Sequence, residues 1–206
     1  MDSIIIGPGE KIIDTLIKDF RKKKLQEVYT QNFKDAHYSD YGHSLREYID
    51  DDLVYNYKKF ALHGDFRGTD VAFSRGCYFK CSFCNTNIPN KQEFKRPEQI
   101  FEEIQYLKNE YKIEAINLKD QVAIPASNDY VDVLNAIKKS NILWRGQTTV
   151  VGSSFDKLKL AKQSGCLDLA VGIESVDYKV RKAIRKPLSD ERINEYINNC
   201  KKNDIK

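Results

Sequence analysis

Residues 70–84 read Asp-Val-Ala-Phe-Ser-Arg-Gly-Cys-Tyr-Phe-Lys-Cys-Ser-Phe-Cys, a short apolar run that leads directly into three cysteines. The run at 70–74 has the length and the composition of a buried strand. Beyond it, three more short apolar runs alternate with amphipathic helical patterns, which is typical of βαβ units around a parallel sheet. The stretch therefore predicts an α/β fold in which the cysteine loop leaves the carboxyl end of the first strand.

The remaining units follow at regular intervals. Further strands are predicted at 114–118, within 142–151 and at 167–173. Helices are predicted from Pro97, around 133–137, from Ser154 to Gly165, and on both sides of Pro187. A closed barrel of eight units takes about 250 residues. We therefore expect residues 67–206 to form a partial (β/α) barrel with four βα units on a parallel sheet.

Residues 1–66 predict a different, small and mostly helical segment. Ile4-Ile5-Ile6 predicts a buried strand, and the apolar stripe within 12–20 predicts a helix. Ser44-Leu45-Arg46-Glu47 matches a capping box and predicts a second helix. The apolar residues expected inside that helix are Leu45, Tyr48 and Ile49.

The composition is that of an ordinary folded protein, with 31% charged and 41% hydrophobic residues and a formal net charge of +4. Because basic and acidic residues are interspersed, charge gives no case for nucleic-acid binding. No apolar run approaches the ~18 residues of a membrane span, and the N-terminus lacks the pattern of a signal peptide. We therefore expect a cytoplasmic protein that does not bind membranes.

The cysteine loop predicts a metal centre. Soft thiolate ligands suit iron–sulfur assembly, and three cysteines where full ligation takes four leave one iron open. An alternative is a structural zinc site completed by His63, although zinc loops usually space their cysteines in C-x2-C pairs. The other two cysteines, Cys166 and Cys200, are predicted to be small core residues.

The spacing Cys77-x3-Cys81-x2-Cys84 resembles the signature of the radical S-adenosylmethionine (SAM) superfamily. Similarities to its cobalamin-associated branch include the preceding Ser-Arg-Gly, Phe83, Asn85-Thr86, residues 96–100 (Arg-Pro-Glu-Gln-Ile) and residues 172–175 (Gly-Ile-Glu-Ser). The resemblance covers roughly residues 68–206.

The resemblance implies that Cys77, Cys81 and Cys84 ligate a 4Fe-4S cluster whose fourth iron binds the amino and carboxylate groups of SAM. It implies an enzyme that reductively cleaves SAM to a 5′-deoxyadenosyl radical, which abstracts hydrogen from an unknown substrate. A reductant protein such as a flavodoxin or ferredoxin would supply the electron.

The resemblance also implies cofactor contacts. Phe83 would lie against the adenine, and Glu174, with Ser175 beside it, would approach the ribose or the methionine portion. Asp120, which follows the second strand, and Gln147, which lies on the third, are further candidates. Alternatives stay open, because Glu174 can be a charge at a helix N-terminus and the other two can be structural polar groups.

Two departures from the family pattern limit these expectations. The chain is expected to cover only the first half of the barrel, so its open edge could pair with a partner chain or with a second copy. Residues 2–10 resemble the last strand and turn of a cobalamin-binding domain, but the Asp-x-His-x-x-Gly cobalt-ligand motif is not found, so cobalamin is unsupported. The alternatives are a half-barrel that binds cluster and SAM but needs a partner chain, and a fragment of a cobalamin-dependent radical SAM methyltransferase.

Overall fold

The computed structural model describes residues 2–32, 34, 36–55, 57–84, 91–125 and 127–206. The chain forms two compact units, residues 1–41 and 42–206. The domain boundary predicted at 66/67 stays a prediction, and residues 42–66 lie in the second unit. Among the described helices, none has the length and apolarity that crossing a membrane requires.

The first unit is a small βαβ arrangement. Strand β1 (Ile4–Ile6) pairs in parallel with β2 (Val28–Thr30), and helix α1 (Ile13–Arg21) connects them. The prediction of a strand at Ile4–Ile6 is correct, but its burial is not found, because Ile4 and Ile6 are 48% and 55% exposed. A two-stranded sheet with one helix has too few layers to cover both faces of the strand. A short 3₁₀ turn, η2 (Tyr38–Asp40), ends the unit.

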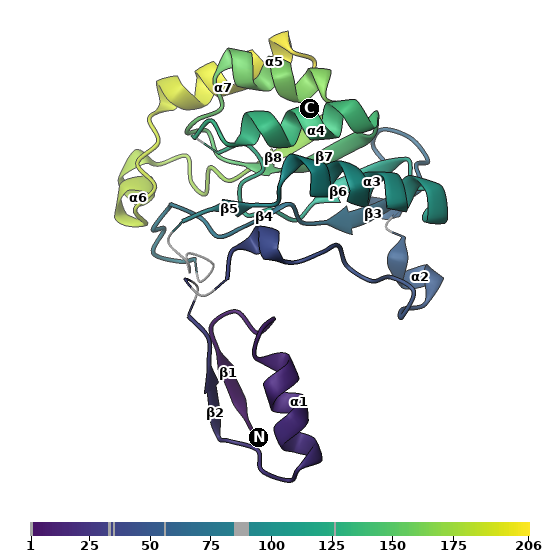
Figure 1. Ribbon diagram of the computed structural model, residues 1–206. Helices are drawn as coiled ribbons and strands as arrows, with labels where there is room; N and C mark the ends of the chain where they lie inside the picture. Colours follow the sequence, from purple (N-terminus) through teal and green to yellow (C-terminus); the bar gives the residue numbers. More distant parts are fainter. Residues whose placement is uncertain (1, 33, 35, 56, 85–90, 126) are drawn as a thin grey trace. The chain divides into compact units, whose positions relative to one another are not determined.

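The second unit is built on a parallel sheet of four strands in the order β3-β6-β7-β8 (Figure 1). The strands are β3 (Gly68–Val71), β6 (Ala115–Leu118), β7 (Leu143–Thr148) and β8 (Cys166–Val171). A two-stranded antiparallel ribbon of β4 (Ser74–Arg75) and β5 (Glu93–Phe94) carries the cysteine loop between its strands. At the far edge, Lys206 follows the pattern of a parallel ladder, since its N–H donates to the Leu167 carbonyl and its carbonyl accepts from the Leu169 N–H.

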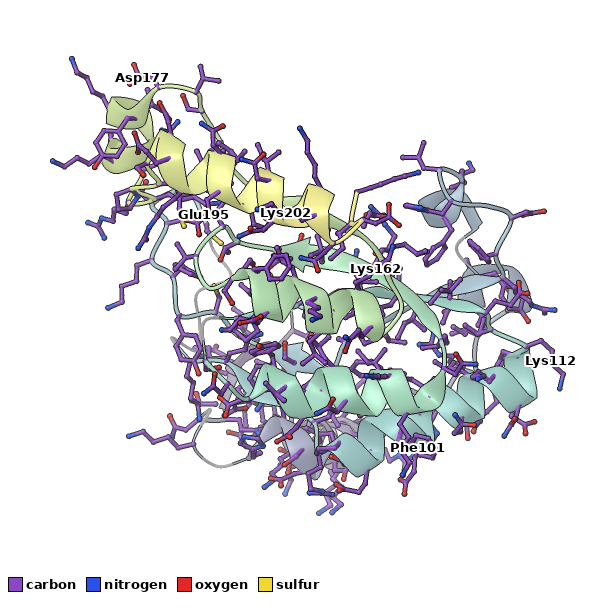
Figure 2. All side chains as sticks on the ribbon, turned by 90° about the horizontal axis from the view of Figure 1, so that it is seen from above. Phe101, Lys112, Lys162, Asp177, Glu195 and Lys202 are labelled. Atoms are coloured by element: carbon purple, nitrogen blue, oxygen red, sulfur yellow. The ribbon has the colours of Figure 1, made fainter. Side chains whose placement is uncertain are left out.

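Four helices form a layer on one face of this sheet, in the spatial order α3, α4, α5, α7. They are α3 (Pro97–Tyr111), α4 (Tyr130–Ser140), α5 (Phe155–Gln163) and α7 (Asp190–Lys202). Figure 2 shows the layer from above, with Lys112 at the end of α3 and Lys202 at the end of α7. The short helix α6 (Tyr178–Ala183) lies between β8 and α7, and α2 (Asp51–Val54) and η3 (Tyr57–Phe60) precede β3.

The two faces of the sheet differ in chemistry because side chains alternate along each strand. The helix-facing residues Ile116, Leu118, Trp144 and Leu169 are buried in the hydrophobic core. The opposite face carries a row of polar residues in register across the four strands. This row is Asp70, Asn117, Arg145 and Asp168.

The structure confirms the predicted fold class, and each of the four βα units lies within a few residues of its expected place. Cys166 and Cys200 are core residues, 1% and 8% exposed, as predicted. The first strand begins earlier than expected, at Gly68, and Ser74 belongs to the separate ribbon.

The prediction of a helix that begins at Ser44 is wrong. Residues 42–46 are irregular, and the apolar side chains expected inside are 57% (Leu45), 79% (Tyr48) and 44% (Ile49) exposed. The buried residue is instead Arg46, whose guanidinium donates to Thr69 Oγ1 at 3.2 Å and to the Asp70 carbonyl at 2.8 Å. A cap contributes only about 1 kcal/mol, and two hydrogen bonds from a buried cation outweigh it.

Replacing Arg46 with Met should lower the free energy of unfolding by about 2 kcal/mol, because both acceptors lose a charged donor. Urea titration followed by circular dichroism measures this change. The matched control is Arg21→Met, because Arg21 is exposed on α1. Equal stability of the two variants would contradict the role given to Arg46.

Candidate active site

A cavity of about 550 Å³ in the second unit lies at the carboxyl ends of β7 and β8. All three cysteines of the loop line it. The facing wall comes from the ends of the two strands and from the connection between α6 and α7. Its members include Gln147, Gly172, Glu174, Arg185 and Lys186.

The cysteine loop is anchored on two sides. Gly76, just before the first cysteine, has φ +86°, a left-handed conformation that glycine adopts without strain. The stem of the loop is held by an ion pair between Arg75 Nε and Glu93 Oε2 at 3.0 Å. Farther along, the Ser82 N–H donates to the Ile184 carbonyl at 3.0 Å. The loop is thereby tied directly to the α6–α7 connection.

The thiols differ in exposure, with Cys77 buried and Cys81 and Cys84 partly exposed. Burial raises the pKa of the Cys77 thiol, and the two neighbouring cysteines add to this, while the Phe79 N–H and the Lys186 ammonium act in the opposite direction. Metal coordination favours the thiolate strongly and reverses the effect of burial.

Glu174 is held in an unusual conformation over Gly172. Its φ of +70° lies in the left-handed region, which costs a non-glycine residue roughly 1–2 kcal/mol. Its Oε1 accepts a hydrogen bond from Lys186 Nζ at 2.8 Å. A Cβ on Gly172 would collide with both of these atoms, so the ion pair is seated directly on the glycine backbone. Strain of this kind is concentrated at functional sites.

Arg181 fixes the segment that carries Glu174 relative to the α6–α7 connection. Its side chain is buried and donates to the carbonyls of Ser175, Val176 and Leu188 at 2.7–3.0 Å. It also pairs with Asp190 at the start of α7. One guanidinium therefore holds both sides of the cavity wall that faces the cysteines.

The cavity brings together six of the eight predicted site residues. They are Cys77, Cys81, Cys84, Phe83, Gln147 and Glu174. The other two are outside its lining. Asp120 is buried behind the loop and accepts from the Phe73 N–H at 3.2 Å, and the Ser175 hydroxyl accepts from the Asp177 N–H at 3.1 Å. As SAM contacts these two stay predictions, and Asn85-Thr86 lies outside the described residues.

Lys186 and Gln121 are among the residues of the lining that sequence reasoning missed. Lys186 lies just before Pro187 in the connection between two predicted helices. Its position in the sequence carries no pattern that predicts a place in the cavity. Gln121 follows Asp120 directly, and its buried Oε1 has no partner among the described residues. The polar side chain after β6 that lines the cavity is therefore Gln121, one position after the predicted Asp120.

His63 does not join the cysteines. Its Nε2 hydrogen-bonds to Asp168 Oδ2 at 2.7 Å, and it is not part of the cavity lining. The described residues therefore give no support to the alternative of a zinc site completed by His63.

The donor set suits an iron–sulfur cluster. Three thiols spread along one wall suit a cubane, in which each thiolate binds a different iron. The lysine beside Cys77 offsets part of the negative charge of such a group.

The model of the radical SAM superfamily matches residues 71–206. The chain therefore belongs to this superfamily, a class of enzymes whose cofactors are a 4Fe-4S cluster and SAM and which need a reductant. Both cofactors agree with the cysteine-lined cavity.

Curated and solved relatives agree with this assignment. An uncharacterised methyltransferase of Pyrococcus horikoshii is 24% identical over 98% of this chain and 46% of its own length. The methyltransferase TsrM of Kitasatospora setae, solved with cobalamin and a [4Fe-4S] cluster, has a TM-score of 0.59 at 12% identity and covers 68% of this chain and 30% of its own. The cobalamin-dependent enzyme OxsB without ligand has a TM-score of 0.61 at 15% identity over 89% and 29%. This chain thus spans less than half the length of each of these relatives.

Burial raises the pKa of Asp120 to about 6, from an ordinary value of 3.8. The folded state then retains a proton that the unfolded state loses between these values, so stability falls as the pH rises from 4 to 7. The expected loss is roughly 3 kcal/mol. Asp120→Asn should remove this loss, which urea titrations at several pH values measure.

Asp204→Asn is the control for this measurement. The pKa of Asp204 is lowered by the hydrogen bond from Lys162, so its contribution is present at neutral pH and is lost as the pH falls. The two variants should therefore change the pH profile in opposite directions. An Asp120→Asn profile parallel to the wild type would contradict the raised pKa.

Proposed function

We propose that this chain is the cluster- and SAM-binding part of a radical SAM enzyme, with Cys77, Cys81 and Cys84 as the cluster ligands. The observation that carries the proposal is the convergence of the three thiols, Gln147 and Glu174 on one cavity. Its volume of about 550 Å³ lies in the range of cofactor pockets.

The chemistry that cluster and SAM supply when bound is one-electron reduction of the sulfonium, which breaks the sulfur–C5′ bond and gives methionine and a 5′-deoxyadenosyl radical. The radical would abstract hydrogen from a substrate. The protein contributes binding, orientation and exclusion of competing reactions.

Individual residues would orient SAM. The Glu174 carboxylate can accept from the ribose hydroxyls or the amino group, and the charge of the acceptor strengthens such bonds. Lys186, which donates to Glu174 at 2.8 Å, would hold the carboxylate in place. Phe83, 58% exposed at the cavity wall, offers an apolar face for adenine. Gln147 offers an amide from the opposite wall.

The source of the electron would be a flavodoxin or a ferredoxin. Three cysteines kept free for metal ligation also suit a reducing compartment, which supports a cytoplasmic location. The sheet edge beyond β8 would be covered by further strands, from a longer chain, a partner or a second copy. Light scattering tests the last of these arrangements, since a clean monomer of this chain would argue against pairing with a second copy.

The direct test of the proposal is SAM cleavage. Anaerobically reconstituted protein, given dithionite and SAM, should form 5′-deoxyadenosine. Cys81→Ala should lose the cluster, measured as iron and sulfide content, and should form at least 100-fold less nucleoside. Cys200→Ala is the matched control, since this cysteine is buried on α7 and should leave both readouts unchanged. A confirmed cluster that forms no nucleoside would rule out the proposed reaction for this chain.

Glu174→Gln should weaken SAM binding about tenfold, because a neutral amide replaces the charged acceptor and loses about 1.4 kcal/mol. Lys186→Met should weaken SAM binding less, because the Glu174 carboxylate remains and only the hydrogen bond that orients it is lost. Equilibrium dialysis with radiolabelled SAM measures both. Glu195→Gln on α7 (Figure 2) is the control and should bind SAM like the wild type. Equal affinities in all the proteins would exclude Glu174 as a contact.

A second candidate is a cobalamin-dependent methyltransferase of which this chain is a part. It is favoured by the relative from Pyrococcus horikoshii, whose match extends over the N-terminal βαβ unit, and by the cobalamin bound in TsrM. The fate of the SAM methyl group discriminates between the two. Hydrogen abstraction alone yields methionine and 5′-deoxyadenosine, whereas methyl transfer also yields S-adenosylhomocysteine.

A further inference from the structure

A second, smaller cavity of about 220 Å³ lies on the sheet face opposite the helices. We call it the polar pocket. The side chains that line it and carry polar groups are Asn117, Lys119, Arg145 and Gln147. Gln147 and Ala170 line both this pocket and the cofactor cavity, so the two adjoin along β7 and β8.

Arg145 is held rigidly at the floor of the polar pocket. Its Nε lies 3.0 Å from both carboxylate oxygens of Asp168, and its Nη2 donates to Oδ1 at 2.8 Å. His63 Nε2 forms a hydrogen bond with Oδ2 of the same carboxylate at 2.7 Å. The pair is therefore neutralised and fixed in orientation, while Nη1 of the guanidinium makes no hydrogen bond within the described residues.

Lys119 supplies a positive charge that nothing in the described part of the chain neutralises. Its side chain is exposed on the pocket wall, and its ammonium forms no ion pair there. The neighbouring Asn117 uses its amide N–H group to bind Asp70 Oδ1 at 2.6 Å, so it does not compensate the charge. The pocket therefore presents one uncompensated cation, one spare guanidinium nitrogen and the Gln147 amide.

We propose that the polar pocket is a substrate subsite that binds an anionic group, a carboxylate or a phosphate, of a small molecule. Such groups accept several hydrogen bonds at once and match a lysine beside an oriented guanidinium. The proposal rests on the proposed function, because it makes the adjoining cofactor cavity the place of reaction. A substrate anchored here would extend past Gln147 toward the cofactor cavity.

The test uses the reconstituted 206-residue protein saturated with SAM, at constant ionic strength. Inorganic phosphate, acetate and the neutral acetamide are titrated as probes, with saturation-transfer NMR on the organic probes and thermal midpoints for phosphate. Wild-type protein should bind at least one of the two anions, and acetamide at least fivefold more weakly. The stronger anion identifies the group.

Lys119→Met should weaken anion binding at least fivefold, and Lys119→Arg should restore most of it. Lys159→Met is the matched control, because Lys159 is exposed on α5 and lines neither cavity, so it should behave like the wild type. Anion binding that is undetectable, or equal in Lys119→Met and the wild type, would overturn the proposal. So would a parallel loss of SAM affinity in Lys119→Met, which would assign the lysine to the cofactor. The proposed function is tested separately by 5′-deoxyadenosine formation, and wild-type protein that forms none would contradict that function.

Discussion

The parallel register of β3, β6, β7 and β8 is the constraint on which the site depends. Because all four strands run in the same direction, their carboxyl ends meet at one edge of the sheet. The cysteine loop follows the first of these strands, and Glu174 follows the last, a hundred residues later. The cysteine loop and Glu174 are too far apart in the sequence for a local interaction to join them. The register of the parallel strands brings them to the same edge of the sheet.

Within that frame, a few polar contacts set the shape of the cavity. The Ser82 N–H bond to Ile184 joins the cysteine loop to the α6–α7 connection, and Arg181 joins that connection to the residues after β8. The Glu174–Lys186 pair, seated on Gly172, then lies opposite the thiols. The cofactor cavity is thus organised by backbone hydrogen bonds, the buried Arg181 and the Glu174–Lys186 ion pair, and not by apolar packing alone.

The sheet separates two kinds of chemistry. Its helix side is apolar and contributes the core, whereas its opposite side carries charged residues in register, from Asp70 to Asp168. The Arg145–Asp168 ion pair on this side is partly buried, with side-chain exposures of 22% and 14%. Arg145 lines the polar pocket beside the cofactor cavity, so this pair orients a cation toward the proposed anion subsite.

Periodicity and spacing predicted the four βα units, because each strand and helix stripe is a local pattern that tertiary contacts reinforce. The cysteine spacing predicted a metal centre, and the family resemblance added Glu174. The structure places all four on one cavity, and their roles as cluster ligands and SAM contact stay predictions. The predicted helix at Ser44–Glu47 is wrong, because long-range hydrogen bonds of Arg46 outweigh a local cap. Lys186 was missed, because only the tertiary fold brings the α6–α7 connection to the cavity.

The central claim is that the three thiols and the Glu174 wall enclose one site for cluster and SAM. The most direct measurement is the electron paramagnetic resonance spectrum of the reduced, reconstituted chain, recorded before and after SAM is added. SAM should change the spectrum, because it binds the iron that the loop leaves open, and Glu174→Gln should need higher SAM concentrations for the same change. A reduced cluster whose spectrum is the same with and without saturating SAM would contradict it.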